Sequence, residues 1–525
     1  MLSFSPSTNK HVLSILDKCS NLNHLKQLQA HLIVLGHGQT HFYAFKLIRF
    51  CTLHLSNLGY ARLLFDKFNS PNIYMYAAMI TAYATSSDHA SAVLLYRHML
   101  RENRSKPNDF VFSIILKSYP GVLKRYGTDL VQAQVVKSGY GGNPAVQTAV
   151  LDAYSRYCVD VGAARKVFDE MSNRSVLSWT AMISGYTRVG LVGNAVLLFD
   201  EVPEGIRDTP FWNSIIAGCV QNGLFSEAIG FFRRMIVEER FGRNRPNEIT
   251  VVSVLSASGH AGLLHLGKCI HGYVCRNGLS LDLFVTNGLI DMYGKCGTYG
   301  KARMVFDNTK ETNLMSWNSL INCCGLHGQS EESVSIFQEM LRRTDDVKPD
   351  GVTFIGLLNA CSHGGLVVEG RYYYDMMVHE YGIEPQIEHY GCLIDLLCRV
   401  GRLEEAMQVV EGMRIPPDEV VWGALLNGSK IHRRVDLADY AVKKLVEINP
   451  KNFGHSAILA NLYQGMEEWD EMQEGKNIPQ DYAYKARGCS WIVVKNQVHQ
   501  FYCADKSHPR TEQIYAVLGC LVDSH

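Results

Sequence analysis

The chain has 525 residues, and its 51 Lys and Arg residues balance 51 Asp and Glu residues. Hydrophobic residues make up 47% and charged residues 19%, which excludes a chain that is disordered as a whole. No apolar run reaches the ~20 residues that span a bilayer, so we expect no membrane partner. Because the net charge is zero, overall electrostatic attraction to phosphates gives no argument for a nucleic-acid partner.

The N-terminal segment, residues 1–40, is predicted to contain a candidate transit peptide and a degenerate repeat. Its first sixteen residues include no acidic residue and are amphipathic, as in organelle transit peptides. The absence of any arginine before Arg49 departs from that composition. The 15 cysteines form no C-x-x-C pair and most lie in apolar helical stretches, which indicates a reducing compartment.

Aromatic residues repeat at a fixed interval after this segment. Trp212, Trp317 and Trp422 are separated by 105 residues each, and Trp179 follows Tyr76 by 103. These intervals are near three times 35, which indicates a repeated unit of about 35 residues. With each aromatic at position 4, the units begin near residues 73, 109, 144, 176, 209, 248, 283, 314, 351, 387 and 419.

Position 15 is glycine in seven consecutive units, and this position follows one amphipathic stretch and precedes another. The glycines are Gly190, Gly223, Gly262, Gly297, Gly328, Gly365 and Gly401. Glycine suits a helix C-terminus because it adopts the left-handed conformation without a Cβ clash. Each unit is therefore predicted to be helix–turn–helix, with its Trp and Phe residues in the core. The predicted fold is all-α, an α-solenoid superhelix of repeats of about 31–39 residues, and a generic helical bundle is disfavoured.

The variation in unit length is larger than that of a tetratricopeptide array, whose repeat is about 34 residues. Val176-Leu-Ser-Trp-Thr-Ala-Met-Ile183 and Ala163-Ala-Arg-Lys-Val-Phe-Asp-Glu-Met171 resemble repeats of the plant pentatricopeptide repeat family. Lys348-Pro-Asp-Gly-Val-Thr-Phe354 resembles the long repeat of its PLS subfamily, which mixes long and short units. Pro417-Asp418 with Val421-Trp-Gly-Ala-Leu-Leu426 resembles that subfamily's E extension, and Gly488-Cys-Ser-Trp-Ile492 resembles its E+ region.

The resemblance divides the chain into four parts. They are the N-terminal segment 1–40, a repeat array at 41–418, E extension motifs at 419–486 and a truncated E+ region at 487–525. The segment Asp470–Gln480 departs from the family because it is acidic and interrupted by Gly and Pro.

The family reads single-stranded RNA with position 5 and the last position of each unit, one unit to a base. By resemblance the RNA-binding pairs are Asn318 with Asp350 for uracil, Thr180 with Asp208 for guanine, Asn213 with Asn247 and Asn287 with Asn313 for a pyrimidine, favouring cytosine, and Ser113 with Asn143 for adenine. Asn and Asp near a helix start are commonly N-caps, and at the last position both roles are compatible. Asn213, Asn287 and Asn318 lie inside predicted helices, so base contact is favoured for them.

Related proteins continue into a DYW deaminase domain, whose zinc chemistry requires H-x-E and C-x-x-C motifs. Neither motif occurs in this chain, so we expect no enzyme, no catalytic residue, no metal site and no cofactor. The resemblance implies an organellar site-recognition factor for C-to-U RNA editing that recruits a deaminase in trans. The expected location is the mitochondrion, with the chloroplast as the alternative. The alternative functions are an organellar splicing or stability factor and a protein-interaction scaffold of tetratricopeptide type.

Overall fold

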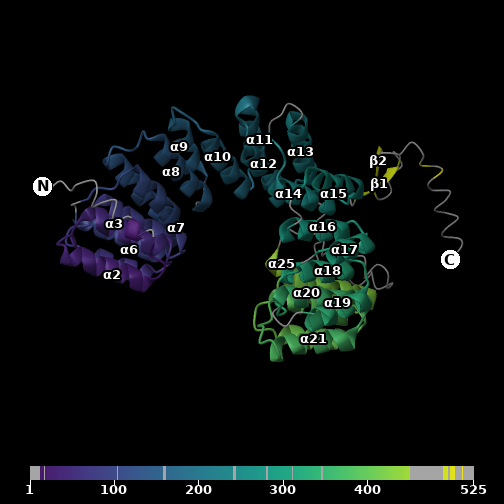
Figure 1. The fold of residues 1–525 in the computed structure, drawn as a ribbon. Helices are drawn as coiled ribbons and strands as arrows, with labels where there is room; N and C mark the ends of the chain where they lie inside the picture. The colour runs from purple at the N-terminus through teal and green to yellow at the C-terminus, as the bar shows by residue number, and fades with distance from the viewer. Residues whose placement is uncertain are drawn as a thin grey trace. The chain divides into compact units, whose positions relative to one another are not determined.

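The computed structural model describes residues 12, 14–16, 18–102, 105–157, 161–239, 244–279, 282–309, 311–343, 347–449, 489–494, 497–502, 511 and 513. The chain divides into two compact units, residues 1–312 and 313–525 (Figure 1). Helices form the described part of the first unit. The second unit contains helices and one two-stranded hairpin.

The first unit contains α2 (Leu22–Val34), α3 (His41–Leu53), α4 (Leu58–Asp66), α5 (Ile73–Thr85), α6 (His89–Glu102), α7 (Asp109–Lys137), α8 (Pro144–Tyr157), α9 (Gly162–Glu170), α10 (Val176–Arg188), α11 (Val192–Glu201), the short 3₁₀ helix η1 (Glu204–Ile206), α12 (Thr209–Gln221), α13 (Phe225–Glu239), α14 (Glu248–His260), α15 (Leu264–Asn277), α16 (Leu283–Lys295) and α17 (Tyr299–Asp307). The first helix of each repeat contacts the first helix of the next, in a row from α3 through α5, α7, α8, α10, α12 and α14 to α16. The second helices pack against their own first helices, as α11 does on α10 and α13 on α12.

The second unit continues the same arrangement with α18 (Leu314–Leu326), α19 (Ser330–Arg343), α20 (Gly351–Gly364), α21 (Val367–His379), α22 (Ile387–Arg399), α23 (Leu403–Glu411), α24 (Glu419–Ile431) and α25 (Val435–Ile448). Its first helices α18, α20, α22 and α24 again contact one another in sequence. Strands β1 (Cys489–Val494) and β2 (Gln497–Tyr502) pair antiparallel, with Cys489 opposite Tyr502. The predicted α-solenoid is confirmed, and the hairpin is an element that the sequence analysis did not predict.

The unit starts predicted from the aromatic spacing agree with the structure. First helices begin at Ile73, Asp109, Pro144, Val176, Thr209, Glu248, Leu283, Leu314, Gly351, Ile387 and Glu419. The residue before each start is the last position of the previous unit, and most of these residues cap the helix that follows. Asp208 Oδ1, for example, accepts the backbone N–H of Phe211 at 2.9 Å, and Asp350 Oδ1 accepts that of Thr353 at 2.9 Å. Such caps satisfy amide donors that have no partner within the helix.

The seven glycines at position 15 all adopt the left-handed conformation, with φ between 65° and 83°. In two further repeats, a residue other than glycine has the left-handed conformation at position 15: Ser87 with φ 60° and Arg433 with φ 56°. The turn geometry is therefore common to the repeats, and glycine is the residue that adopts it at least cost.

The unit that begins at Asp109 is a correction to the prediction, because it is not helix–turn–helix. Helix α7 runs without a break from Asp109 to Lys137. Leu123 occupies position 15 of this unit, where the seven glycines end a helix elsewhere. Leucine adopts the left-handed conformation only with strain, and in this repeat the first helix continues into the second.

The predicted core residues are buried. Trp212 and Trp317 have no exposed surface, and Trp179 and Trp422 are exposed by 9% and 6%. Phe199 stacks on Phe211 and meets Trp212 edge-on, with ring centroids 4.8 Å apart in both cases. Burial of large aromatic side chains between helix pairs is the main source of stability in such stacks. Among the residues described, no helix is both long and apolar enough to cross a bilayer.

Candidate nucleic-acid interface

The three position-5 asparagines lie within first helices and away from the helix caps, as expected. Asn213 is in α12, Asn287 in α16 and Asn318 in α18. Their exposed fractions are only 8%, 6% and 7%. A buried amide requires hydrogen-bond partners, so the identity of those partners determines what each amide can still contact.

Two of these amides bond to the cap of the next first helix. Asn213 Nδ2 donates to Asn247 Oδ1 at 3.0 Å, and Asn318 Nδ2 donates to Asp350 Oδ1 at 3.1 Å. The structure therefore joins position 5 directly to the last position in these two repeats. Each pair is one hydrogen-bonded polar group whose two residues come from neighbouring repeats.

In both cases, the third residue of the following first helix adds a hydrogen bond to the asparagine amide. Thr250 Oγ1 donates to Asn213 Oδ1 at 2.5 Å, and Thr353 Oγ1 donates to Asn318 Oδ1 at 2.7 Å. Sequence reasoning missed these threonines. The available signal was that Asn or Asp followed three residues later by Thr is a capping pattern, seen at both helix starts.

Asn287 differs from the other two asparagines. Its Oδ1 is buried and has no hydrogen-bond partner among the residues described. Its predicted partner, Asn313, begins the second unit and caps α18, where its Oδ1 accepts the backbone N–H of Ser316 at 3.0 Å. Asn287 Oδ1 therefore lacks the donor that holds the amide oxygens of Asn213 and Asn318, and an unsatisfied buried carbonyl oxygen is costly.

The remaining two predicted pairs are not joined by hydrogen bonds. Thr180 Oγ1 donates to Val176 O at 2.8 Å and Ser113 Oγ donates to Asp109 O at 2.8 Å, so each hydroxyl bonds to its own helix. Their predicted partners, Asp208 and Asn143, cap the next first helices. The Asn amide extends further from the backbone than a hydroxyl, and in the two asparagine repeats it bonds to the next cap.

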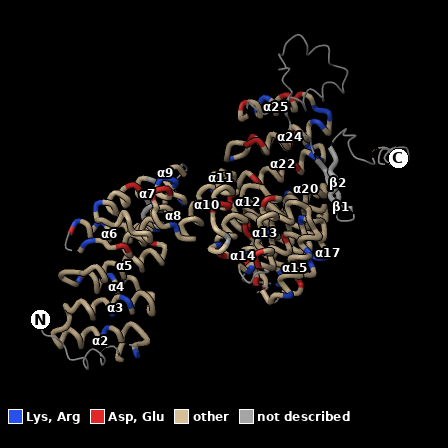
Figure 2. Tube along the Cα trace, turned by 90° about the horizontal axis from the view of Figure 1, so that it is seen from above, with Lys and Arg blue, Asp and Glu red and all other residues tan. Residues whose placement is uncertain are grey.

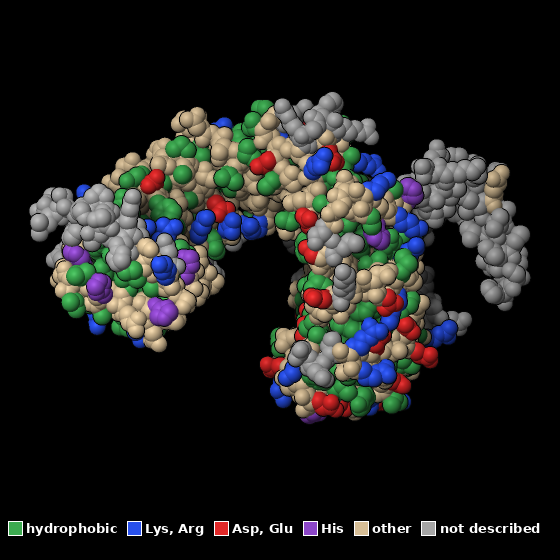
Figure 3. Space-filling model, viewed as in Figure 1, with side chains coloured by type: hydrophobic (Ala, Val, Ile, Leu, Met, Phe, Trp, Pro, Cys, Tyr) green, Lys and Arg blue, Asp and Glu red, His purple; other side chains and the backbone are tan. Residues whose placement is uncertain are grey.

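A row of exposed apolar side chains at position 2 was also missed by sequence reasoning. They are Tyr74, Phe110, Leu177, Ile249 and Phe284 in the first unit and Met315, Val352 and Val420 in the second, exposed by 50–67%. Residues three apart share a helix face, so position 2 lies beside position 5. Apolar and aromatic groups at this spacing can stack on the flat faces of bases. Figure 3 shows hydrophobic side chains exposed among charged ones in both units.

Basic residues recur in the last turn of the first helices. They are Arg156, Arg188, His260, Lys295, His363, Arg399 and Lys430. Three are paired with an aspartate four residues earlier: Arg156 with Asp152 at 2.8 Å, Lys295 with Asp291 at 2.8 Å and Arg399 with Asp395 at 2.7 Å. Figure 2 shows Lys and Arg interspersed with Asp and Glu along both units. At these three places the positive charge is therefore paired within its own helix.

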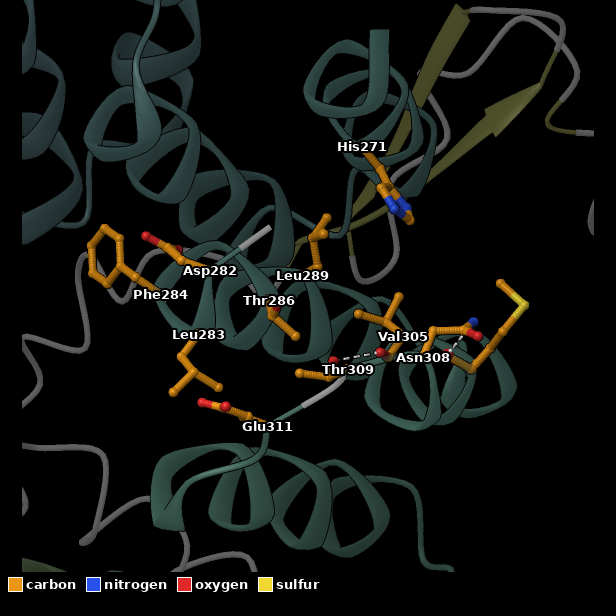
Figure 4. Close-up of a pocket in the computed structure, with 11 residues that line it drawn as sticks. His271, Asp282, Leu283, Phe284, Thr286, Leu289, Val305, Asn308, Thr309 and Glu311 are labelled. Carbon is orange, nitrogen blue, oxygen red and sulfur yellow. Dashed lines mark hydrogen bonds between the residues drawn. The ribbon is translucent and has the colours of Figure 1, made fainter. Parts of the chain in front are cut away.

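A cavity of about 1030 Å³ lies among α15, α16 and α17 (Figure 4). His271 Nδ1 and the Tyr293 hydroxyl are 3.0 Å apart, and Thr309 Oγ1 donates to Val305 O at 2.8 Å. Burial, and to a smaller extent Lys301, lowers the pKa of His271. These side chains bond within the protein and form no nucleophile–base pair. Within the described ranges, no cluster of His, Cys, Asp and Glu could hold a metal ion.

Comparison with known families gives matches along most of the chain. Segments match the PPR repeat (177–204, 211–239, 284–313 and 381–414), the PPR repeat family (312–363) and the pentatricopeptide repeat domain (69–121). Residues 432–493 match the E motif, and of these the structure describes 432–449 and 489–493.

Several curated proteins of Arabidopsis thaliana are similar over nearly the whole chain. Pentatricopeptide repeat-containing protein At1g33350 is 50% identical over 98% of this chain and 95% of its own length. Pentatricopeptide repeat-containing protein CRR2, chloroplastic, is 35% identical over 99% of this chain and 74% of its own length. Pentatricopeptide repeat-containing protein At1g59720, chloroplastic/mitochondrial, is 32% identical over 99% of this chain and 78% of its own length.

Solved structures include the maize pentatricopeptide repeat protein PPR10 in complex with an 18-nt psaJ RNA element. It is 14% identical, with a TM-score of 0.41, over 90% of this chain and 87% of that chain. Yeast Rmd9p in complex with a 16-nt target RNA is 13% identical, with a TM-score of 0.35, over 84% of this chain and 98% of that chain. On the identity and coverage of its curated relatives, the chain belongs to the pentatricopeptide repeat family.

Proposed function

We propose that this protein binds single-stranded RNA in a sequence-specific manner inside an organelle. The observation that supports this most is that four repeats carry an exposed apolar residue at position 2 beside a polar residue at position 5: Phe110 with Ser113, Leu177 with Thr180, Phe284 with Asn287 and Met315 with Asn318. Stacking on position 2 supplies affinity for any base, and the polar group beside it supplies selectivity. The two solved structures named above contain RNA, which is consistent with this proposal.

The proposed base assignments follow the family's pairs. The Asn318–Asp350 pair is assigned to uracil, and the Asn213–Asn247 and Asn287–Asn313 pairs to a pyrimidine, favouring cytosine. The Thr180–Asp208 pair is assigned to guanine and the Ser113–Asn143 pair to adenine. Hydrogen bonds between position 5 and the last position support the pairing in the first two cases.

The proposed biological role is recognition of sites for C-to-U editing, with a deaminase supplied by another protein. The match to the E motif at residues 432–493 supports this role over splicing or transcript stability, which remain the alternatives. The proposed parts of the chain are the array at 41–418, the E extension at 419–486 and the E+ region at 487–525. The proposed location is a mitochondrion or a chloroplast, since the names of two relatives carry one or both organelles.

RNA binding is tested with the full chain and a pool of randomised single-stranded RNA of ~20 nucleotides. We expect the wild-type protein to enrich a defined sequence. Asn213→Ala and Asn318→Ala should each weaken the preference at one base position by about tenfold, because each change removes the amide beside that base. Asn308→Ala is the matched control, since Asn308 is the exposed C-cap of the second helix α17 and bonds to Met304 O of that helix. A scaffold protein would enrich no sequence.

The editing role is tested in plants that lack this protein. We expect editing to be lost at one or a few organellar cytidines, and to return when the wild-type gene is reintroduced. Unchanged editing in both organelles, together with a defect in splicing or transcript level, would assign the alternative role.

A further inference from the structure

Two buried threonines contact the position-5 asparagines from the following repeat. Thr250 is the third residue of α14 and Thr353 the third residue of α20, and neither has exposed surface. Each hydroxyl is a donor to the asparagine amide oxygen, at 2.5 Å for Asn213 and 2.7 Å for Asn318. The threonine thus holds the oxygen of each amide, and the cap holds its nitrogen.

The direction of the hydrogen bonds is set by backbone donors, whose roles cannot change. The backbone N–H of Asn247 donates to Thr250 Oγ1 at 3.2 Å, and that of Thr250 donates to Asn247 Oδ1 at 3.1 Å. Because Asn247 Oδ1 is thereby an acceptor, the Asn213 atom that faces it must be the Nδ2 donor. The Asn213 amide oxygen then faces Thr250 Oγ1 at 2.5 Å, which is shorter than the 3.0 Å from this hydroxyl to its other acceptor, Asn247 Oδ1.

The same chain of donors and acceptors occurs in the second unit. The backbone N–H of Asp350 donates to Thr353 Oγ1 at 3.1 Å, and that of Thr353 donates to Asp350 Oδ1 at 2.9 Å. A carboxylate only accepts, so Asn318 again presents Nδ2 to the cap and Oδ1 to the threonine. The two asparagines therefore have the same fixed orientation.

A fixed orientation limits what each repeat can offer a base. The asparagine keeps one Nδ2 hydrogen beyond the bond to its cap. The cap keeps its second polar atom, which is the acceptor Oδ2 in Asp350 and the donor Nδ2 in Asn247. If either amide rotated by 180°, its donor and acceptor would exchange places and the distinction between bases would be lost.

We propose that Thr250 and Thr353 are positioning residues that determine base selectivity by fixing the amides of Asn213 and Asn318. This inference rests on the proposed function, since it concerns RNA binding at the same repeats. The threonines are buried behind the asparagines, so they act through the amides and do not contact the base.

Other repeats lack this arrangement and provide the control. Ser178 is the third residue of α10, is equally buried, and donates to Ser175 O of its own turn at 2.7 Å. Phe211 and Val285, at the same place in α12 and α16, have no hydroxyl. Ser178→Ala therefore removes a buried hydroxyl at an equivalent place without affecting a position-5 amide.

The experiment measures base preference in the full chain with the randomised RNA pool. Thr250→Val and Thr353→Val keep the β-branched shape and remove the hydroxyl. We expect each to reduce the preference at its own single base position by about three- to tenfold, because the amide oxygen loses its donor and the side chain is then held only by its bond to the cap. Thr353→Ser should retain the preference, and Ser178→Ala should leave every position unchanged. Melting curves establish that each variant is folded.

Four results would overturn the inference. A uniform loss of affinity in the valine variants with unchanged base preference would show that the threonines only stabilise the fold. Failure of both valine variants to fold would show the same. Equal loss in Thr353→Ser and Thr353→Val would show that the hydroxyl is not responsible. Absence of any sequence enrichment by the wild-type protein would overturn this inference and the proposed function together, whereas the first three outcomes leave the proposed function intact.

Discussion

At the scale of single residues, the structure shows the burial and the hydrogen-bond partners of side chains, which the sequence does not reveal. The resemblance predicts that Asn213 and Asn318 contact bases, and the structure shows that both are more than nine-tenths buried and bond to the next cap. Position alone predicts that they share a helix face with position 2. Sequence cannot predict their partners, because Thr250 and Thr353 come from the next repeat and meet them only when the units stack.

Burial also separates the cysteines by reactivity. Burial raises the pKa of Cys51, Cys361 and Cys398 to about 12, whereas Cys269 and Cys275 are exposed. Because the thiolate is the nucleophile, iodoacetamide at pH 8 should alkylate the two exposed residues and spare the three buried ones. Peptide mapping by mass spectrometry checks this result. Unfolding in urea should make all five reactive, and early alkylation of Cys361 in native protein would contradict the burial.

At the scale of elements, the turn between the paired helices is a repeated left-handed residue. The glycine register predicts this turn in seven units, because only glycine adopts positive φ without strain. Ser87 and Arg433 show that the stack imposes the same turn where the sequence lacks glycine. Helix α7 shows the opposite outcome, since it continues through position 15. The local sequence signal therefore identifies most turns, and packing decides the exceptions.

Replacement of Arg433 by glycine should stabilise the protein. Arg433 is exposed and has φ 56°, so the change removes backbone strain and little side-chain packing. We expect the free energy of unfolding to rise by about 0.5–1 kcal/mol, measured by denaturant titration. Arg433→Ala is the control and should give no gain, because alanine has the same strain. Gly297→Ala, at the equivalent turn with φ 74°, should lower the free energy by a similar amount.

At the scale of the whole molecule, the total charge is balanced, and three basic residues of the first helices are also paired within their own helices. Ion pairs within the first helices neutralise Arg156, Lys295 and Arg399, so these residues attract phosphates weakly. Affinity for RNA must then come mainly from stacking and base contacts. The composition predicts a neutral chain, and the pairing shows that no large basic excess arises at these three places.

Salt dependence tests this conclusion. Each phosphate contact on a single strand contributes about 0.7 to the slope of log K against log salt concentration, and we expect a slope between roughly −1 and −3. Binding of the enriched RNA is measured from low to high salt. A slope steeper than about −5 would show that many phosphate contacts dominate. Asp291→Asn frees Lys295 from its ion pair and should make the slope steeper.

Acidic pH should destabilise the first unit. Burial is the main cause that lowers the pKa of His260 and of His271, with smaller contributions from Lys295 and Lys301 respectively. As pH falls through about 6.5, the unfolded chain takes up protons that these folded residues resist, so stability is lost. The melting temperature should therefore fall between pH 7.5 and 5.5. His271→Asn keeps a polar group near Tyr293 and should reduce this dependence; an unchanged dependence would exclude His271 as a cause.

The sequence by itself determined the period, the starts of the first helices, the glycine turns and the aromatic core. These features depend on residues within one unit, where spacing along the chain corresponds directly to a helix face or a cap. Only the tertiary structure showed the unbroken α7, the left-handed Ser87 and Arg433, and the bonds that join Asn213 and Asn318 to the next unit. Those features depend on contacts between repeats. The partner residues come within reach of one another only when the helix pairs are stacked.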